Sequence, residues 1–105
     1  MAERRNNRRK RVLLEAKWES VSRRHEARVD DVSLGGCFVN TYGHVELNEP
    51  VGLQILLPSG VWLNLRGTVV TYQPGVGFGM AFSLSSDEEK AAVNELITSS
   101  VERPL

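Results

Sequence analysis

The sequence has a single cysteine, Cys37, and no apolar run that approaches the ~20 residues needed to cross a bilayer. One cysteine cannot form an internal disulfide, and the cysteine and histidines lack the spacing of a metal site. The N-terminus is basic but lacks the apolar stretch of a secretory signal, so we expect the mature chain to begin near Met1 and to be cytoplasmic. The length, 105 residues, suits one domain. These absences argue against a disulfide-rich secreted protein and against membrane insertion.

Charge is unevenly distributed along the chain although the net charge is zero. Residues 1–28 hold ten Lys/Arg and four Asp/Glu, which gives +6, whereas residues 29–105 hold three and nine, which gives −6. A basic end of this kind indicates contact with something anionic, such as a nucleotide, a nucleic acid, a membrane face or the acidic remainder of the chain.

Alternating and apolar segments predict a mostly β fold. Residues 1–11 have no apolar periodicity, and we expect a flexible basic arm there. Six short strands are then expected, with turn residues between them, at 12–21, 25–32, 37–39, 51–57, 61–72 and 76–82. Gly67, in the middle of the fifth segment, suggests a bulge or bend. Ser86 and Glu89 fit a capping box that opens an amphipathic helix over about 86–102. The order predicts a small antiparallel barrel or curled sheet, over residues 12–105, with a C-terminal helix.

The segment from Asp31 to Gly36 reads D-x-S-x-x-G and follows an alternating strand. The short side chains of Asp31 and Ser33 can bond nearby backbone or an outside partner, and Gly35 and Gly36 let the backbone turn sharply or approach a ligand. Taken alone, the segment is better explained as a tight turn between two strands.

A second motif lies upstream, where Arg5 and Arg9 form R-x-x-x-R in the basic arm. The planar guanidinium fits phosphate oxygens and the Hoogsteen edge of guanine, and it can stack on a base. Two such residues on one arm can close around a single ligand. A solvated basic tail is the simpler alternative for an arginine run.

The two motifs together, in a small β domain, resemble the PilZ domain, a family that binds the bacterial second messenger cyclic di-GMP. The resemblance covers nearly the whole chain, and the stretches 65–70 and 77–82 are similar to the closing strands of the family. It implies a six-stranded antiparallel barrel with a C-terminal helix.

The resemblance also implies roles for the arm. Arg5 and Arg9 match the arginine motif and should clamp guanine and phosphate. Arg4 precedes the motif, and in the family an arginine there accompanies two stacked, intercalated ligand molecules rather than one. The pair Arg4 and Arg8 has the same spacing. We prefer Arg5 and Arg9, because Glu3, Arg4 and Arg5 then fall where the family often has an acidic residue followed by paired arginines. Arg8 and Arg11 are within reach of phosphate.

On the barrel, the resemblance implies that Asp31 and Ser33 bond the other guanine or the phosphate. Gly36, with Gly35 in a secondary role, should keep that surface open to the flat ligand. Cyclic di-GMP is thus the implied ligand, with no cofactor and no metal.

No arrangement of residues indicates catalysis. His25 and His44 have no acid or nucleophile at a recognisable spacing and are expected at the surface, and Cys37 is expected to be buried and inert. We therefore predict a receptor, not an enzyme, that acts through an unidentified protein partner. Two alternatives remain at this point. The first is a PilZ-fold adaptor that works without nucleotide, and the second, ranked below it, is binding of nucleic acid or an anionic membrane by the arm.

Overall fold

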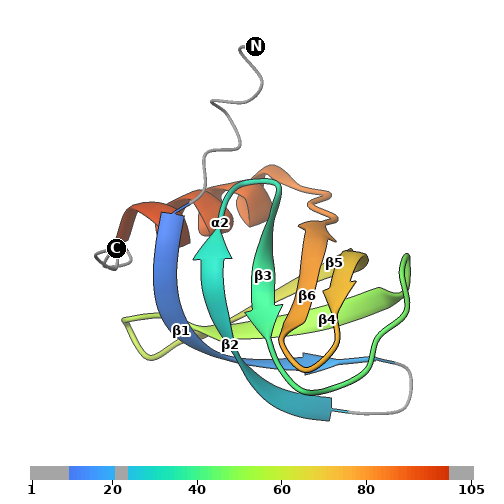
Figure 1. Cartoon of the computed structure of the whole chain (residues 1–105). Helices are drawn as coiled ribbons and strands as arrows, with labels where there is room; N and C mark the ends of the chain where they lie inside the picture. Colours follow the sequence, from blue (N-terminus) through green and yellow to red (C-terminus); the bar gives the residue numbers. More distant parts are fainter. Residues whose placement is uncertain (1–9, 21–23, 100–105) are drawn as a thin grey trace.

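The computed structural model describes residues 10–20 and 24–99, and all structural statements below concern these residues. The described residues form six strands and one helix, in the order β1 (Lys10–Glu19), β2 (Arg24–Val32), β3 (Gly36–Asn40), β4 (Pro50–Leu56), β5 (Trp62–Gln73), β6 (Gly77–Phe82) and α2 (Asp87–Ser99). Neighbouring strands are antiparallel and close into a barrel in the order β1-β2-β3-β6-β5-β4 (Figure 1). The predicted all-β barrel with a C-terminal helix is confirmed.

Strand β1 illustrates how alternating buried and exposed side chains form the two faces of the barrel wall. Val12, Ala16 and Trp18 are buried in the core, while Glu15 and Glu19 are exposed. Side chains of a strand point alternately to its two faces, so one face of β1 fills the interior and the other stays in solvent. Burying a large apolar side chain contributes roughly 1.5–3 kcal/mol, so the inward face stabilises the closed sheet.

The boundary between arm and barrel lies earlier than the sequence indicates. Lys10 and Arg11, which we assigned to the arm, belong to β1 and lie opposite Val32 and Asp31 of β2. The register shifts between Arg11 and Leu14, which marks a β-bulge. A bulge interrupts alternation without ending the strand, and this is why the pattern did not extend to Lys10.

The bulge expected at Gly67 is found elsewhere in β5. The register with β6 shifts between Val69 and Thr71, so Val70 is the extra residue. Gly67 instead permits close approach, because a β-carbon there would overlap the carbonyl oxygen of Ala81. A glycine within a strand marks either a bulge or a close contact, and the sequence does not distinguish the two.

Trp18 is the centre of the core. It is fully buried, and its ring lies 5.1 Å from that of Phe78 in an edge-to-face arrangement. His25 stacks on its other side at 4.4 Å, so this histidine is half-buried rather than at the open surface. The indole Nε1 donates a buried hydrogen bond of 3.0 Å to Oγ1 of Thr41, as a buried tryptophan requires.

Substituting valine for Thr41 is expected to destabilise the barrel by about 1–3 kcal/mol, because the buried indole N–H then has no acceptor. Denaturant unfolding measures the loss. Thr68→Val is the matched control, since the Thr68 hydroxyl forms no hydrogen bond with the described residues. Equal stability of the two variants would contradict the assigned role of Thr41.

Helix α2 lies against the barrel at the end where β1 begins (Figure 1). Val93 and Leu96 are fully buried, and Ile97 packs partly against the core. Nζ of Lys10 donates to the carbonyl oxygen of Ile97 at 2.7 Å, which ties the start of β1 to the last turns of the helix. The end of the predicted helix, 100–102, lies outside the described residues. No helix in the part of the chain described here has the length and apolar character needed to span a membrane.

The helix begins with a variant of the predicted capping box. Oγ of Ser86 accepts from the backbone N–H of Glu89 at 3.1 Å, as expected. The Glu89 carboxylate, however, accepts from the backbone N–H and the hydroxyl of Ser85, at 2.7 and 3.1 Å, rather than from Ser86. The bond from the Ser85 backbone is the main cause that lowers the pKa of Glu89 below its ordinary value.

Glu89→Gln should therefore lower stability at neutral pH and have little effect in acid. A carboxylate with a lowered folded-state pKa stabilises the fold above its ordinary pKa, and that contribution is lost as the pH falls through the lowered value. Unfolding curves from pH 7 down to pH 2 measure the difference between variant and wild type. Glu88→Gln, in the same first turn but without these bonds, is the control. A difference that is independent of pH would rule out this account of the cap.

Candidate functional site

The carboxylate of Asp31 lies on the outer surface of the barrel. Asp31 is half-buried near the end of β2, opposite Arg11 of β1 on one side and Phe38 of β3 on the other. Its neighbour Val32 is buried and faces the core. The register of β2 against β3 shifts between Val29 and Asp31, so a bulge sets which way this carboxylate points.

The turn after Asp31 is held by its own hydrogen bonds. The backbone N–H of Ser33 donates to the carbonyl oxygen of Gly36 at 2.8 Å, and the Ser33 hydroxyl donates to the same oxygen at 3.4 Å. The N–H of Gly35 donates to the Ser33 hydroxyl at 3.2 Å, and Gly35 accepts from Phe82 of β6 at 2.9 Å. Ser33 is buried, so the structure gives it a role in shaping the turn, and its contact with ligand stays a prediction.

The structure shows why position 36 requires a glycine, which the sequence did not reveal. It is buried where β3 pairs with β6, and a β-carbon there would overlap the carbonyl oxygen of Met80. The absence of a side chain is therefore required by strand pairing. The role of Gly36 in keeping the surface open to a ligand stays a prediction. Gly35, in contrast, is exposed.

The arginines predicted to bind the ligand, Arg4, Arg5, Arg8 and Arg9, lie outside the described residues. What is described is the point where the chain enters the barrel. Lys10 begins β1 directly after Arg9, and the next residue, Arg11, lies opposite Asp31. In the sequence, only Lys10 stands between Arg9 and Arg11, the residue that lies opposite Asp31.

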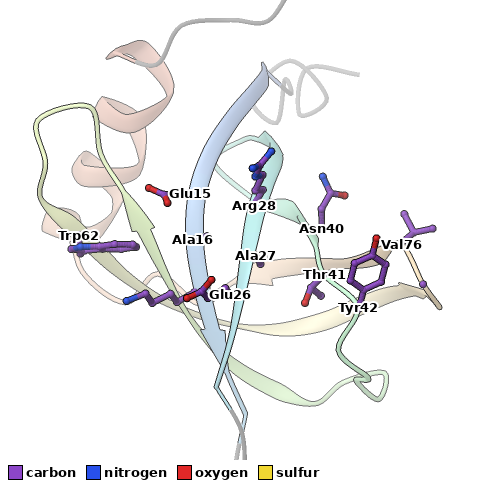
Figure 2. A pocket seen from close by; sticks show the side chains of 12 residues that line it. Glu15, Ala16, Glu26, Ala27, Arg28, Asn40, Thr41, Tyr42, Trp62 and Val76 are labelled. Atoms are coloured by element: carbon purple, nitrogen blue, oxygen red, sulfur yellow. The ribbon is translucent and has the colours of Figure 1, made fainter.

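A groove of about 750 Å³ on the barrel is lined by none of the predicted site residues (Figure 2). It crosses the outer face of β1 and β2 between two rows of side chains, one with Glu15 and Arg28, the other with Lys17 and Glu26. Trp62 lies at one end, with Nζ of Lys17 4.9 Å from its ring centroid. Half of the residues of the predicted site, the four arginines, lie outside the described range. The described barrel therefore contains only the other half of the predicted site.

Cys37 and His44 lie as the sequence predicts, and His44 makes contacts that were not predicted. Cys37 is buried. Nε2 of His44 pairs with the carboxylate of Glu46 at 2.6 Å, and Nδ1 of His44 lies 3.4 Å from the Tyr72 hydroxyl, contacts that sequence spacing alone did not predict. The ring of Tyr72 also packs against the edge of the core, while His44 and Glu46 are exposed. No cluster of His, Cys, Asp and Glu within residues 10–20 and 24–99 could hold a metal ion.

These features define a small closed β-barrel domain, with Asp31 on the outer face of β2 and with Ser33 and Gly36 buried in the turn and strand that follow it. The model of the family described as the PilZ domain matches residues 3–99, and the chain belongs to this family. No curated protein gives a significant match.

Several solved structures are similar in fold, and two of them are described here. The PilZ domain of CeSA from a cellulose-synthesizing bacterium has a TM-score of 0.73 at 18% identity, over 87% of this chain and 95% of that one. The Bacillus subtilis inhibitor of motility MotI/DgrA has a TM-score of 0.67 at 15% identity, over 90% of this chain and 49% of that one. At these identities the likeness concerns the fold alone.

Proposed function

We propose that this chain is a bacterial cyclic di-GMP receptor that holds the dinucleotide between its N-terminal arginines and the outer surface around Asp31. The observation that carries the proposal is the position of the Asp31 carboxylate, which faces outward beside the strand that Arg9 leads into. Membership in the PilZ family supports it, because the family in general binds this ligand.

The chemistry of the ligand suits the residues. Cyclic di-GMP carries two negative charges and two guanine bases. Arg5 and Arg9 supply charge-assisted bonds to phosphate and to the Hoogsteen edge of guanine. Asp31 accepts from the N1–H and N2–H donors of the other guanine, a pairing for which a carboxylate has two suitable oxygens. Arg8 and Arg11 add positive charge near the phosphates.

The proposal includes two further points that rest on the family pattern. Arg4 favours an intercalated pair of ligand molecules over a single one. Ser33, Gly35 and Gly36 contribute by the shape of the turn on which the base lies. Ligand binding orders the arm against the barrel and so changes the surface offered to a protein partner in the cytoplasm. The domain is a receptor without catalysis and without a cofactor.

Paired substitutions distinguish this function from general binding of polyanions. Arg9→Ala and Asp31→Ala should each abolish binding of cyclic di-GMP if the ligand is held from both sides. If the arm alone binds any polyphosphate, only the arginine variant loses binding, and unrelated nucleic acids or anionic vesicles bind with the same steep salt dependence. Titrations of both variants at two salt concentrations, with a DNA duplex as competitor, separate the two outcomes.

A PilZ-fold adaptor that acts without nucleotide is the second candidate. It predicts no binding of cyclic di-GMP by the wild-type chain at any salt concentration. The presence of both complete motifs, at Arg5 and Arg9 and at Asp31, Ser33 and Gly36, favours the receptor.

A further inference from the structure

Phe38 is an aromatic residue on the outside of the barrel. Its neighbours in β3, Cys37 and Val39, are fully buried, whereas Phe38 is partly exposed and does not belong to the core. In the sequence these three residues form one apolar run, but a strand sends the middle one to the opposite face. The fold therefore leaves this aromatic ring outside the interior.

The register places Phe38 beside Asp31. The two residues are opposite each other on β2 and β3, and both face outward. Side chains of directly opposed residues have their β-carbons about 4.5–5.5 Å apart, so the carboxylate and the ring share one patch of surface. Arg11 lies on the far side of Asp31, which gives a cation, a carboxylate and an aromatic ring in a row across three strands.

Strand β6 supports the ring from one side. The positions where Gly77 and Gly79 would carry β-carbons lie 3.0 Å from Cε2 and 3.9 Å from Cδ1 of Phe38. These two ring atoms are on opposite sides of the ring, so the ring spans two successive outward positions of β6. A β-carbon at Gly77 would press on the ring, whereas one at Gly79 would only touch it at an ordinary contact distance, so the ring lies directly against the backbone of β6.

We propose that Phe38 is the stacking platform for the guanine base whose edge is bound by Asp31, an inference that rests on the proposed function. Recognition of a purine needs a flat apolar surface for its face and hydrogen-bonding groups for its edge, and aromatic side chains supply the face. A base stacked on Phe38 with its edge toward β2 meets the carboxylate directly. Phe38 thus selects for a base, and Asp31 selects guanine among bases.

The test compares cyclic di-GMP affinity among Phe38→Leu, Phe38→Tyr and wild type by titration calorimetry. Leucine keeps the apolar bulk but removes the π face, so we expect a loss of roughly 5- to 150-fold, the range for one base–aromatic stack. Tyrosine keeps the face and should bind within about twofold of wild type. Val61→Ala, an exposed apolar residue in the connection between β4 and β5, is the control and should bind like wild type.

A spectroscopic readout separates stacking from packing. Phe38→Trp adds a fluorophore at the platform, and stacking of guanine on it should quench fluorescence beyond the change seen in wild type, which contains only Trp18 and Trp62. If the wild type binds cyclic di-GMP and Phe38→Leu binds it with the same affinity, the proposed role of Phe38 is wrong and the receptor proposal stands. Absence of binding by the wild type would overturn both.

Discussion

Replacing Asp31 by asparagine is expected to weaken cyclic di-GMP binding roughly 100-fold. The carboxylate accepts two donors of guanine, and the amide can accept only one and turns its own N–H₂ toward the other. Hydrogen bonds to a charged group contribute about 1.5–3 kcal/mol, and about 3 kcal/mol corresponds to this loss. Titration calorimetry of the purified variant measures it.

Asp30→Asn is the matched control for this experiment. It removes one negative charge from the adjacent residue, which is the extra residue of the bulge in β2. If binding depends on the direction of one carboxylate, Asp30→Asn should keep an affinity within a few-fold of wild type. Equal losses in both variants would mean that net charge, rather than the placement of Asp31, governs binding.

Replacing Gly36 by alanine is expected to destabilise the fold by about 3 kcal/mol or more. The added β-carbon would overlap the carbonyl oxygen of Met80, and because that atom belongs to backbone it cannot rotate away. The pairing of β3 with β6 closes one side of the barrel, so the damage spreads beyond the turn. Denaturant unfolding measures the stability, and far-ultraviolet circular dichroism reports any loss of β structure.

Gly52→Ala controls for the general cost of changing a strand glycine. A β-carbon at Gly52 would first meet Cγ of Glu19 at 3.5 Å, an ordinary contact with a flexible side chain. We expect this variant to keep wild-type stability. A Gly36→Ala protein that is as stable as Gly52→Ala but fails to bind the ligand would mean that Gly36 serves the ligand surface, as the family pattern suggests, and not strand pairing.

The barrel was predictable because its signal is local. Alternation in segments such as 12–18 identifies an inner and an outer face, and six such segments with a capped helix restrict the architecture to a few choices. Val12, Ala16 and Trp18 alternate along this segment and are indeed buried. The cap that Ser86 gives the helix was equally readable, since it joins residues only three apart, although the Glu89 carboxylate bonds Ser85 instead of Ser86.

What the sequence did not reveal depends on register and on distant contacts. The close approach of Gly36 to Met80 joins residues far apart in the chain, and the bulge at Val70 depends on how β5 meets β6. The apolar run around Phe38 hid its outward direction, because strand alternation is visible only when polar and apolar residues alternate. The motif predicted Asp31 as a site residue, but not its neighbour across the sheet.

The most direct test of the central claim is isothermal titration of the purified wild-type chain with cyclic di-GMP at moderate salt, with GTP and cyclic di-AMP as controls. The account predicts saturable binding of cyclic di-GMP alone, with a ratio near two ligands per chain if Arg4 has its proposed role. No heat at high ligand concentration, together with no competition in an independent binding assay, would contradict the receptor function and favour the nucleotide-free adaptor.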